Sequence, residues 1–233
     1  MTPETFAEMA RRHREADMLV ASSFKMVNGQ ACSIGCFCHD YGLAPDDFNG
    51  LSKITEYPEA AHRLQEAIFE GLPKEERADW HVAFAEKAAT VTDWQSVIDK
   101  TVLASLRIAE PHDTSESKVV AMVIDLYERR LNGDNPSDAE WYDARAAAFA
   151  ADAVGAAAGA ARATARAAAW ATAWATAQSA WAEGAADAAG SAAGAAWAAA
   201  CDAVGAAKPG WAMSWYDADA AAWMQIRDAF LNA

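Results

Sequence analysis

The sequence predicts an all-α fold, a multi-helix bundle or stack whose C-terminal half is rich in alanine and tryptophan. More than half of the residues from 144 to 207 are alanine, the best helix former because its side chain loses no rotamer freedom. Ten tryptophans occur in the chain, and several recur at helical spacing among the alanines. Small alanines and large indoles together predict helices whose axes approach closely.

The N-terminal half alternates apolar stripes of helical period with residues that stop helices. Thr2 or Pro3 is expected to begin a first helix that ends near Val20. After an irregular stretch, four more helices are predicted, with approximate ranges 58–71, 73–88, 92–110 and 114–131. The sequence Thr92-Asp93-Trp94-Gln95 predicts a capping box, and Asn132-Gly133 predicts the end of the last of these helices.

Residues 21–50 are predicted to be irregular, because Gly35, Gly42 and Asn49-Gly50 interrupt any helical pattern there. Within this stretch, Asn28-Gly29 lies between two short apolar runs, which is a strong signal for a two-residue β-hairpin turn. We therefore expect a small irregular or hairpin segment near residues 23–40. It is the one place where the sequence predicts β structure.

The break at Asn132-Gly133 predicts two domains, a helical domain over residues 1–133 and an Ala/Trp-rich helical domain over residues 134–233. Ser137 and Glu140 predict a capping box at the start of the second domain. A final helix is expected over about 214–231. Inside this domain the hexapeptide Asp-Ala-Val-Gly-Ala-Ala occurs at 152–157 and again at 202–207, either as a duplicated helical unit or by chance.

Two patterns in the second domain predict helix contacts. Three tryptophans share one face of a predicted helix, which is typical of a core stripe and also compatible with a tryptophan-lined ligand groove. Two Gly-x-x-x-Gly pairs provide flat surfaces where another helix can approach closely, within one chain or in a homodimer. The candidate interface residues are Trp170, Trp174, Trp181, Gly155, Gly159, Gly190 and Gly194.

A formal net charge of −14 restricts the classes of partner. Generic nucleic-acid binding needs clustered Lys and Arg, and anionic lipid would be repelled, so neither partner is expected. The longest charge-free run, 167–182, is shorter than the roughly 20 apolar residues of a membrane span. Without a recognisable targeting segment or a disulfide pattern, the expected location is the cytoplasm.

Cys32, Cys36, Cys38 and His39 form the one cluster in the sequence with obvious chemistry. If the segment is extended, the three cysteines share a face; if it is helical, Cys32, Cys36 and His39 do. Thiolates and imidazole bind zinc, so zinc is the one cofactor that the sequence suggests, with a fourth ligand from another histidine. Structural thiols without a cofactor are the simpler interpretation.

A second hypothesis makes Cys32 a nucleophile with His39 or a distant histidine as its base. A thiol at the start of a helix has a lowered pKa, which would favour this role. The glycine loops and triad motifs of common enzymes are absent from the sequence, so a function without catalysis is preferred.

The segments Gln30-Ala31-Cys32-Ser33-Ile34-Gly35-Cys36 and Leu64-Gln65-Glu66-Ala67-Ile68-Phe69-Glu70-Gly71-Leu72-Pro73, followed by an Ala/Trp-rich tail, resemble alanine-rich phage- and prophage-encoded proteins of unknown function. The C-terminal part is similar to alanine-rich domains of immunity proteins. The resemblance implies a role in conflict between phage and host. It implies no catalytic residue.

Charge, motifs and resemblance together lead to three functional hypotheses. The first is a phage-type accessory protein that binds a host protein or nucleoprotein complex, most concretely an anti-CRISPR-like inhibitor that mimics nucleic acid with its acidic helices. The second is a small cysteine-dependent enzyme centred on Cys32. The third is a small-molecule sponge that uses the tryptophan-lined groove.

Overall fold

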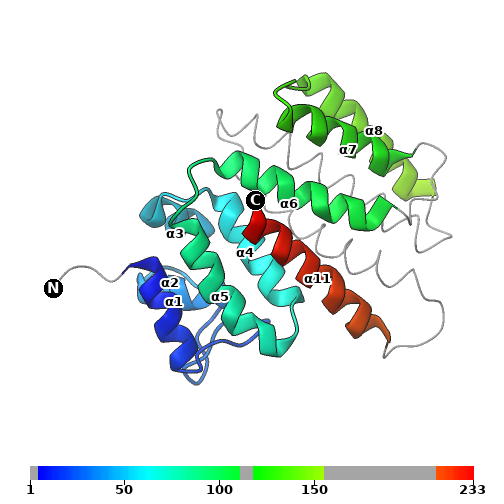
Figure 1. Cartoon of the computed structure of the whole chain (residues 1–233). Coiled ribbons are helices and arrows are strands. Elements are labelled where there is room, and N and C mark those ends of the chain that lie inside the picture. Colours follow the sequence, from blue (N-terminus) through cyan, green and yellow to red (C-terminus); the bar gives the residue numbers. More distant parts are fainter. Residues whose placement is uncertain (1–4, 111–117, 155–213) are drawn as a thin grey trace. The chain divides into compact units, whose positions relative to one another are not determined.

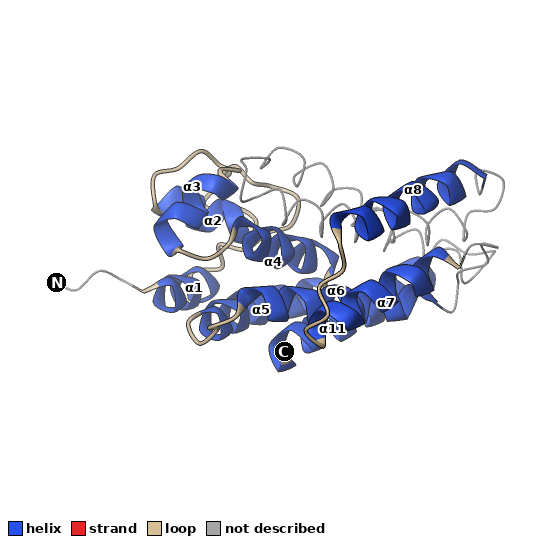
Figure 2. Ribbon diagram, turned by 90° about the horizontal axis from the view of Figure 1, so that it is seen from above, coloured by secondary structure: helices blue, strands red, loops and turns tan. Residues whose placement is uncertain are grey.

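A computed structural model describes residues 5–110, 118–154 and 214–233 of the chain (Figure 1). Regular structure in these residues consists of helices, as Figure 2 shows, and the predicted all-α class is confirmed. The helices are α1 (Phe6–Glu15), α2 (Ser33–Asp40), α3 (Phe48–Thr55), α4 (Glu59–Gly71), α5 (Lys74–Ala88), α6 (Trp94–Ala109), α7 (Val119–Leu131), α8 (Asp138–Val154) and α11 (Ser214–Asn232). None of the helices in the described ranges is both long and apolar enough to cross a membrane.

The chain divides into two compact units. Unit 1 comprises Met1–Ile98 together with Arg227–Ala233, and unit 2 comprises Asp99–Ile226. This division falls within α6 and α11 and does not coincide with the predicted boundary at residue 133. Most of the alanine-rich stretch, including every candidate interface residue named above, lies outside the described residues.

Unit 1 is built on a core of aromatic side chains. Helix α5 contacts α1 and α4, and α2 contacts α3 and α4. Phe6 of α1 stacks on Phe37 of α2 with ring centroids 3.8 Å apart. The C-terminal end of the chain completes this core, because Phe230 lies against Trp80 and Phe84 of α5 at centroid distances of 5.3 and 5.2 Å. Residues more than 140 positions apart in the chain therefore share one core.

Capping residues explain where several helices begin. The predicted box at Ser137 and Glu140 is present, with the Ser137 N–H donating to the Glu140 carboxylate at 2.7 Å. Helix α6 begins one residue later than a Thr92 cap would place it, because Asp93 accepts the N–H of Ser96 at 3.0 Å. A capping box at Thr5 and Glu8 starts α1 at Phe6, three or four residues after the predicted start at Pro3 or Thr2.

Helices α2 and α3 occupy a region that was predicted to be irregular. Their glycines lie in first turns rather than in helix interiors, where glycine is most costly. Gly35 allows α2 to lie directly against the backbone carbonyl of Phe24, where any β-carbon would collide. Gly50 donates its N–H to the capping carboxylate of Asp47 at 2.7 Å. These glycines permit close contacts that the helices need. The prediction that they interrupt helical structure in this region was therefore wrong.

The turn at Asn28-Gly29 forms as predicted, but the hairpin does not extend beyond it. Both residues have positive φ, 53° and 83°, and Val27 and Gln30 exchange two backbone hydrogen bonds. The described residues here contain isolated bridges, Val27 with Gln30 and Leu19 with Ala31, instead of strands. The reason is that the second arm enters α2 at Ser33, so its backbone groups bond within the helix.

Unit 2 contains a buried ion pair between α6 and α7. Arg130 donates from Nε to Oδ2 of Asp99 at 2.7 Å, and a second guanidinium nitrogen bonds the other carboxylate oxygen. The guanidinium also lies 4.9 Å from the ring centroid of Tyr127 and 5.0 Å from that of Trp141 on α8. The guanidinium of Arg130 therefore has a bidentate carboxylate partner and lies against two aromatic rings.

We expect Gly35→Ala to lower the free energy of unfolding by at least about 1 kcal/mol, because the new methyl group meets the Phe24 carbonyl. Without that collision, alanine in a helix would stabilise the protein by up to about 1 kcal/mol. Urea unfolding followed by circular dichroism measures the change. The exposed Asn49→Ala on α3 serves as control and should stay within about 0.5 kcal/mol of wild type. A Gly35→Ala protein as stable as wild type would contradict the close packing.

We expect Asp99→Ala to cost about 3–5 kcal/mol, because it leaves the Arg130 guanidinium buried without its counter-charge. The control is Asp125→Ala, whose carboxylate is 67% exposed and lies 3.9 Å from Arg129. That change should cost less than about 1 kcal/mol. Equal losses in the two variants, measured by thermal or urea unfolding, would show that the Asp99 pair is not a structural anchor.

Candidate functional site

Cys32 lies at the start of α2 and caps it. Its sulfur accepts the N–H of Gly35 at 3.4 Å, and the residue is fully buried. The helical alternative for the cysteine segment is therefore the correct one. Serine, threonine, aspartate and asparagine are the usual residues at such a position, so a cysteine cap is a departure from the ordinary choice.

The other members of the predicted zinc set lie elsewhere. The thiol of Cys36 points to the carbonyl oxygens of Met18 and Ala31, at 3.5 and 3.6 Å. Cys38 is buried and lies 4.0 Å from the carbonyl oxygen of Asp47, whereas His39 is exposed. Within the described residues, these side chains do not join Cys32 in a group whose ligand atoms are close enough to share a metal ion.

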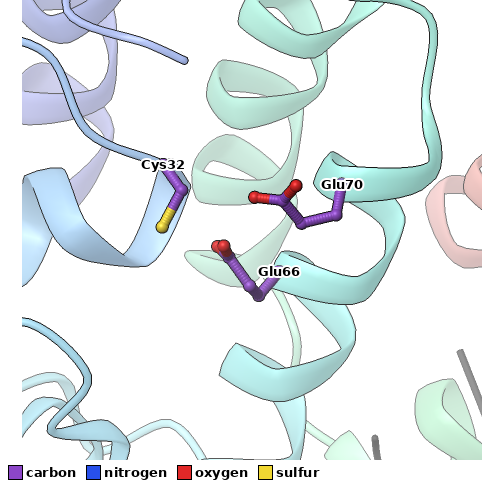
Figure 3. A group of neighbouring side chains, drawn as sticks. All are labelled: Cys32, Glu66 and Glu70. Atoms are coloured by element: carbon purple, nitrogen blue, oxygen red, sulfur yellow. The ribbon is translucent and has the colours of Figure 1, made fainter. Parts of the chain in front are cut away.

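Cys32 instead lies beside two carboxylates of α4, Glu66 and Glu70 (Figure 3). The sulfur and one oxygen from each glutamate all lie within 4.8 Å of one another. Glu66 and Glu70 are four residues apart, so they project from the same face of the helix. We call these three side chains the Cys32–Glu66–Glu70 cluster. In Figure 3 the thiol and both carboxyl groups point toward a common position between α2 and α4.

Glu66 is the more buried of the two glutamates, with 6% of its surface exposed. One oxygen, Oε2, accepts the N–H of Ile34 in the first turn of α2 at 3.0 Å. The other oxygen, Oε1, is buried and has no hydrogen-bond partner. Burial, together with the nearby carboxylate of Glu70, raises the pKa of Glu66 to about 8.

The same surroundings disfavour Cys32 as a nucleophile. Burial and the charge of Glu66 raise the pKa of the Cys32 thiol, and together they outweigh the lowering expected at a helix start. His39 lies seven residues further along, a rise of about 10 Å, which is beyond the roughly 3 Å reach of a base. The cluster thus holds a neutral thiol rather than an activated one.

A second polar group fills the centre of unit 1, and it contains all three histidines of the described core. His13 of α1 and His81 of α5 bond each other at 3.0 Å, and His81 bonds the hydroxyl of Ser33 at 2.8 Å. Successive hydrogen bonds of 2.7–3.4 Å connect Asp40, His13, His81, Ser33, Gln65, His62 and Thr55. We call this series the buried relay. The relay joins α1, α2, α3, α4 and α5.

The donors of the buried relay can be assigned in one direction. Gln65 donates to the Ser33 hydroxyl at 2.7 Å, so the Ser33 hydrogen is available for Nδ1 of His81. Nε2–H of His81 then donates to His13, and Nε2–H of His13 donates to the Asp40 carboxylate at 2.7 Å. His81 and His13 are neutral in this arrangement, and each of their ring nitrogens has one role. A charged His13 would leave the Ser33 hydrogen without an acceptor in the relay.

Burial sets the protonation of these groups. It lowers the pKa of His62 to about 4, against a small opposing effect of Gln65. It also lowers the pKa of His81 well below its usual value, and a positive charge on His13 would lower that pKa further. Burial would raise the pKa of Asp40, but hydrogen bonds from His13 and Arg12 lower it below its usual range. A Ser–His pair suggests hydrolytic chemistry, yet Ser33 is fully buried and no substrate reaches it.

The sequence predicted neither the Cys32–Glu66–Glu70 cluster nor the buried relay, although it contains one signal for the cluster. Glu66 and Glu70 lie beside Ile68 and Phe69, which belong to an apolar stripe, and a pair of acids four residues apart there is unexpected. The sequence offered His13, His62 and His81 as a fourth zinc ligand, with a distant histidine also as a base for Cys32. Each of them is engaged in the relay, and His112 lies outside the described residues.

The relay predicts a specific loss of stability in acid. Unfolded His62 gains a proton near pH 6.5 and folded His62 only near pH 4, so its stabilising contribution is complete above 6.5 and declines down to about 4. The free energy of unfolding of His62→Gln should therefore fall less steeply over that range, by up to about 1.4 kcal/mol per pH unit. Urea titrations at a series of pH values test this. The exposed, non-titrating control Asn49→Ala should keep the wild-type slope, and a wild-type slope in His62→Gln would contradict the assignment.

Comparison with protein-family models, with curated proteins and with solved structures finds no match for this chain. Its function is therefore inferred from the geometry and chemistry of its own residues.

Proposed function

We propose that this protein acts by binding another protein, and that residues 16–31, between α1 and α2, form the contact. The observation that carries the proposal is the exposure of apolar side chains on this loop. Val20, Phe24 and Val27 are 39%, 39% and 53% exposed. Exposed apolar side chains that gather on one segment are a common mark of a protein-binding surface. We call residues 16–31 the apolar loop.

The apolar loop is held in one conformation by many hydrogen bonds. The two sides of the loop are joined where Ala31 accepts the N–H of Val20 at 2.9 Å, and its tip is closed by the Val27–Gln30 pair. Ser22 donates its N–H to the Glu70 carboxylate at 2.7 Å, which fixes the middle of the loop to α4. A loop that is already ordered loses less conformational entropy on binding, so its exposed side chains can contribute more to affinity.

Charge favours a basic partner. With a net charge of −14, the protein attracts positively charged surfaces and speeds association with them. Nucleic-acid-binding proteins and nucleoprotein complexes present such surfaces. In its finer form the proposal follows the phage resemblance: the protein is an accessory factor that inhibits a host defence complex, as an anti-CRISPR protein does, with acidic helices in place of nucleic acid.

The two alternative functions have less support. An enzyme centred on Cys32 would need an exposed, ionised thiol, whereas this thiol is buried with a raised pKa. The small-molecule sponge depends on Trp170, Trp174 and Trp181, which lie outside the described residues.

Affinity capture from host lysate with matched variants tests the contact. The loop variant Val20→Ser/Val27→Ser removes exposed apolar side chains, and the control Ile54→Ser/Met122→Ser does the same on α3 and α7. We expect wild type and control to retain the same host protein and the loop variant to retain at least about tenfold less, equivalent to about 1.4 kcal/mol. Equal retention by both variants, or retention of no specific protein, would contradict the proposal.

The finer proposal has its own experiment. Expression of the full chain in CRISPR-protected cells should raise the plating efficiency of a targeted phage, and the loop variant should not. Unchanged plating by the wild-type protein across several defence systems would remove the counter-defence function while leaving protein binding to be judged by affinity capture.

A further inference from the structure

The Cys32–Glu66–Glu70 cluster brings three acidic groups together without a cation. Among the described residues, Glu66 and Glu70 form no ion pair with lysine, arginine or histidine. The guanidinium of Arg77 donates to the backbone carbonyls of Phe69 and Glu70, at 3.0 and 3.1 Å, and not to a carboxylate of the cluster. Two charged carboxylates four residues apart on a helix destabilise it, and burial increases that cost, so Glu66 keeps its proton up to about pH 8 when no cation is present.

The helix start of α2 accounts for only part of this arrangement. Oε2 of Glu66 accepts the N–H of Ile34, and a carboxylate at a helix N-terminus is favourable. That contact leaves Oε1 of the same side chain buried without a partner. A buried unsatisfied carboxylate oxygen costs about 1–3 kcal/mol or more, so its presence in the cluster needs another explanation.

Each carboxylate could bind a metal ion with one oxygen and keep a hydrogen bond to the backbone with the other. Glu66 would keep Oε2 on Ile34 and offer Oε1, whereas Glu70 holds the N–H of Ser22 with both oxygens, at 2.7 and 2.9 Å, and could free one. Ligands in metal sites are commonly oriented by such outer hydrogen bonds. Glu70 is only partly buried, so the cluster is accessible from its side.

We propose that Cys32, Glu66 and Glu70 form a binding site for one divalent transition-metal ion, and that zinc fits it best. One thiolate and two carboxylates are a mixed soft and hard set that zinc accepts, whereas calcium and magnesium prefer oxygen alone. Three protein ligands leave the fourth tetrahedral position for water. This site differs from the zinc set predicted by the sequence, since it shares only Cys32 with it.

Binding of a metal ion requires the three ligand atoms to move closer together. Around tetrahedral zinc the ligand atoms are ~3.4–3.6 Å apart, compared with the 4.8 Å within which the three atoms now lie. Rotation of the glutamate side chains supplies such a change without moving a helix. Metal binding displaces the thiol proton and any proton on Glu66, and these leave to solvent. The proposal does not depend on protein binding by the apolar loop.

Equilibrium dialysis of the full chain against zinc, and titration with cobalt as a coloured substitute, test the site. We expect one ion per chain, with a thiolate-to-cobalt charge-transfer band in the near ultraviolet. Cys32→Ser should abolish the band while keeping a good helix cap. Glu66→Gln and Glu70→Gln should weaken binding by about 100-fold or more, beyond the 10–100-fold typical of outer partners.

Matched controls distinguish the two ligand sets. His39→Gln and Cys36→Ser should bind zinc with wild-type affinity, because neither side chain belongs to the cluster. The proposal is overturned if the chain binds no zinc or cobalt, or if the control variants lose the ion while the glutamate variants keep it. Glu70 is only partly buried, so Glu70→Gln remains informative if the other substitutions prevent folding. If the metal-free protein still captures its partner, protein binding does not require the metal ion, and the failure of one proposal can be told from the failure of the other.

Discussion

The buried relay is the interaction on which unit 1 depends. It places His13, His62 and His81 at the centre of five helices, and all three are fully buried. Each buried polar group would cost about 1–3 kcal/mol without its partner, so the helices must hold one mutual arrangement for all the bonds to form. Apolar packing alone tolerates alternatives, whereas a connected polar series specifies a single core. The aromatic rings of Phe37 and Phe6 pack against this series and exclude water.

The residues at the start of α2 connect the buried relay to the Cys32–Glu66–Glu70 cluster and to the apolar loop. Cys32 faces the carboxylates of α4, Ser33 bonds His81 and Gln65, and the N–H of Ile34 bonds Glu66. One helix start therefore fixes the relay, the Cys32–Glu66–Glu70 cluster and one end of the apolar loop. Glu70 reaches the loop through Ser22, so the acid cluster and the loop conformation are physically coupled. A metal ion in the cluster would restrain the same loop that we propose as the protein contact.

Local signals in the sequence predicted the all-α class, the Ser137 capping box, the Asn28-Gly29 turn and the final helix. These features depend on neighbouring residues, and propensity and capping rules describe them well. Helices α2 and α3 escaped prediction because their glycines serve tertiary contacts, which no local rule contains. The candidate site escaped for the same reason: Cys32 meets Glu66 across 34 positions, and only the fold makes them neighbours. Phe230 in the core of unit 1 is a further example of long-range packing.

Imidazole nitrogen NMR of the full chain tests the buried relay most directly, because it reports which ring nitrogens carry protons. The account predicts that at pH 6 the His62 ring carries a single proton and that the His81 ring is protonated on Nε2 alone, in one tautomer. The lowered pKa of each buried ring and the hydrogen bond from Ser33 to Nδ1 of His81 require these states. A doubly protonated His62 or His81 ring at pH 6, or averaging between tautomers of His81, would contradict the relay as the constraint that specifies this core.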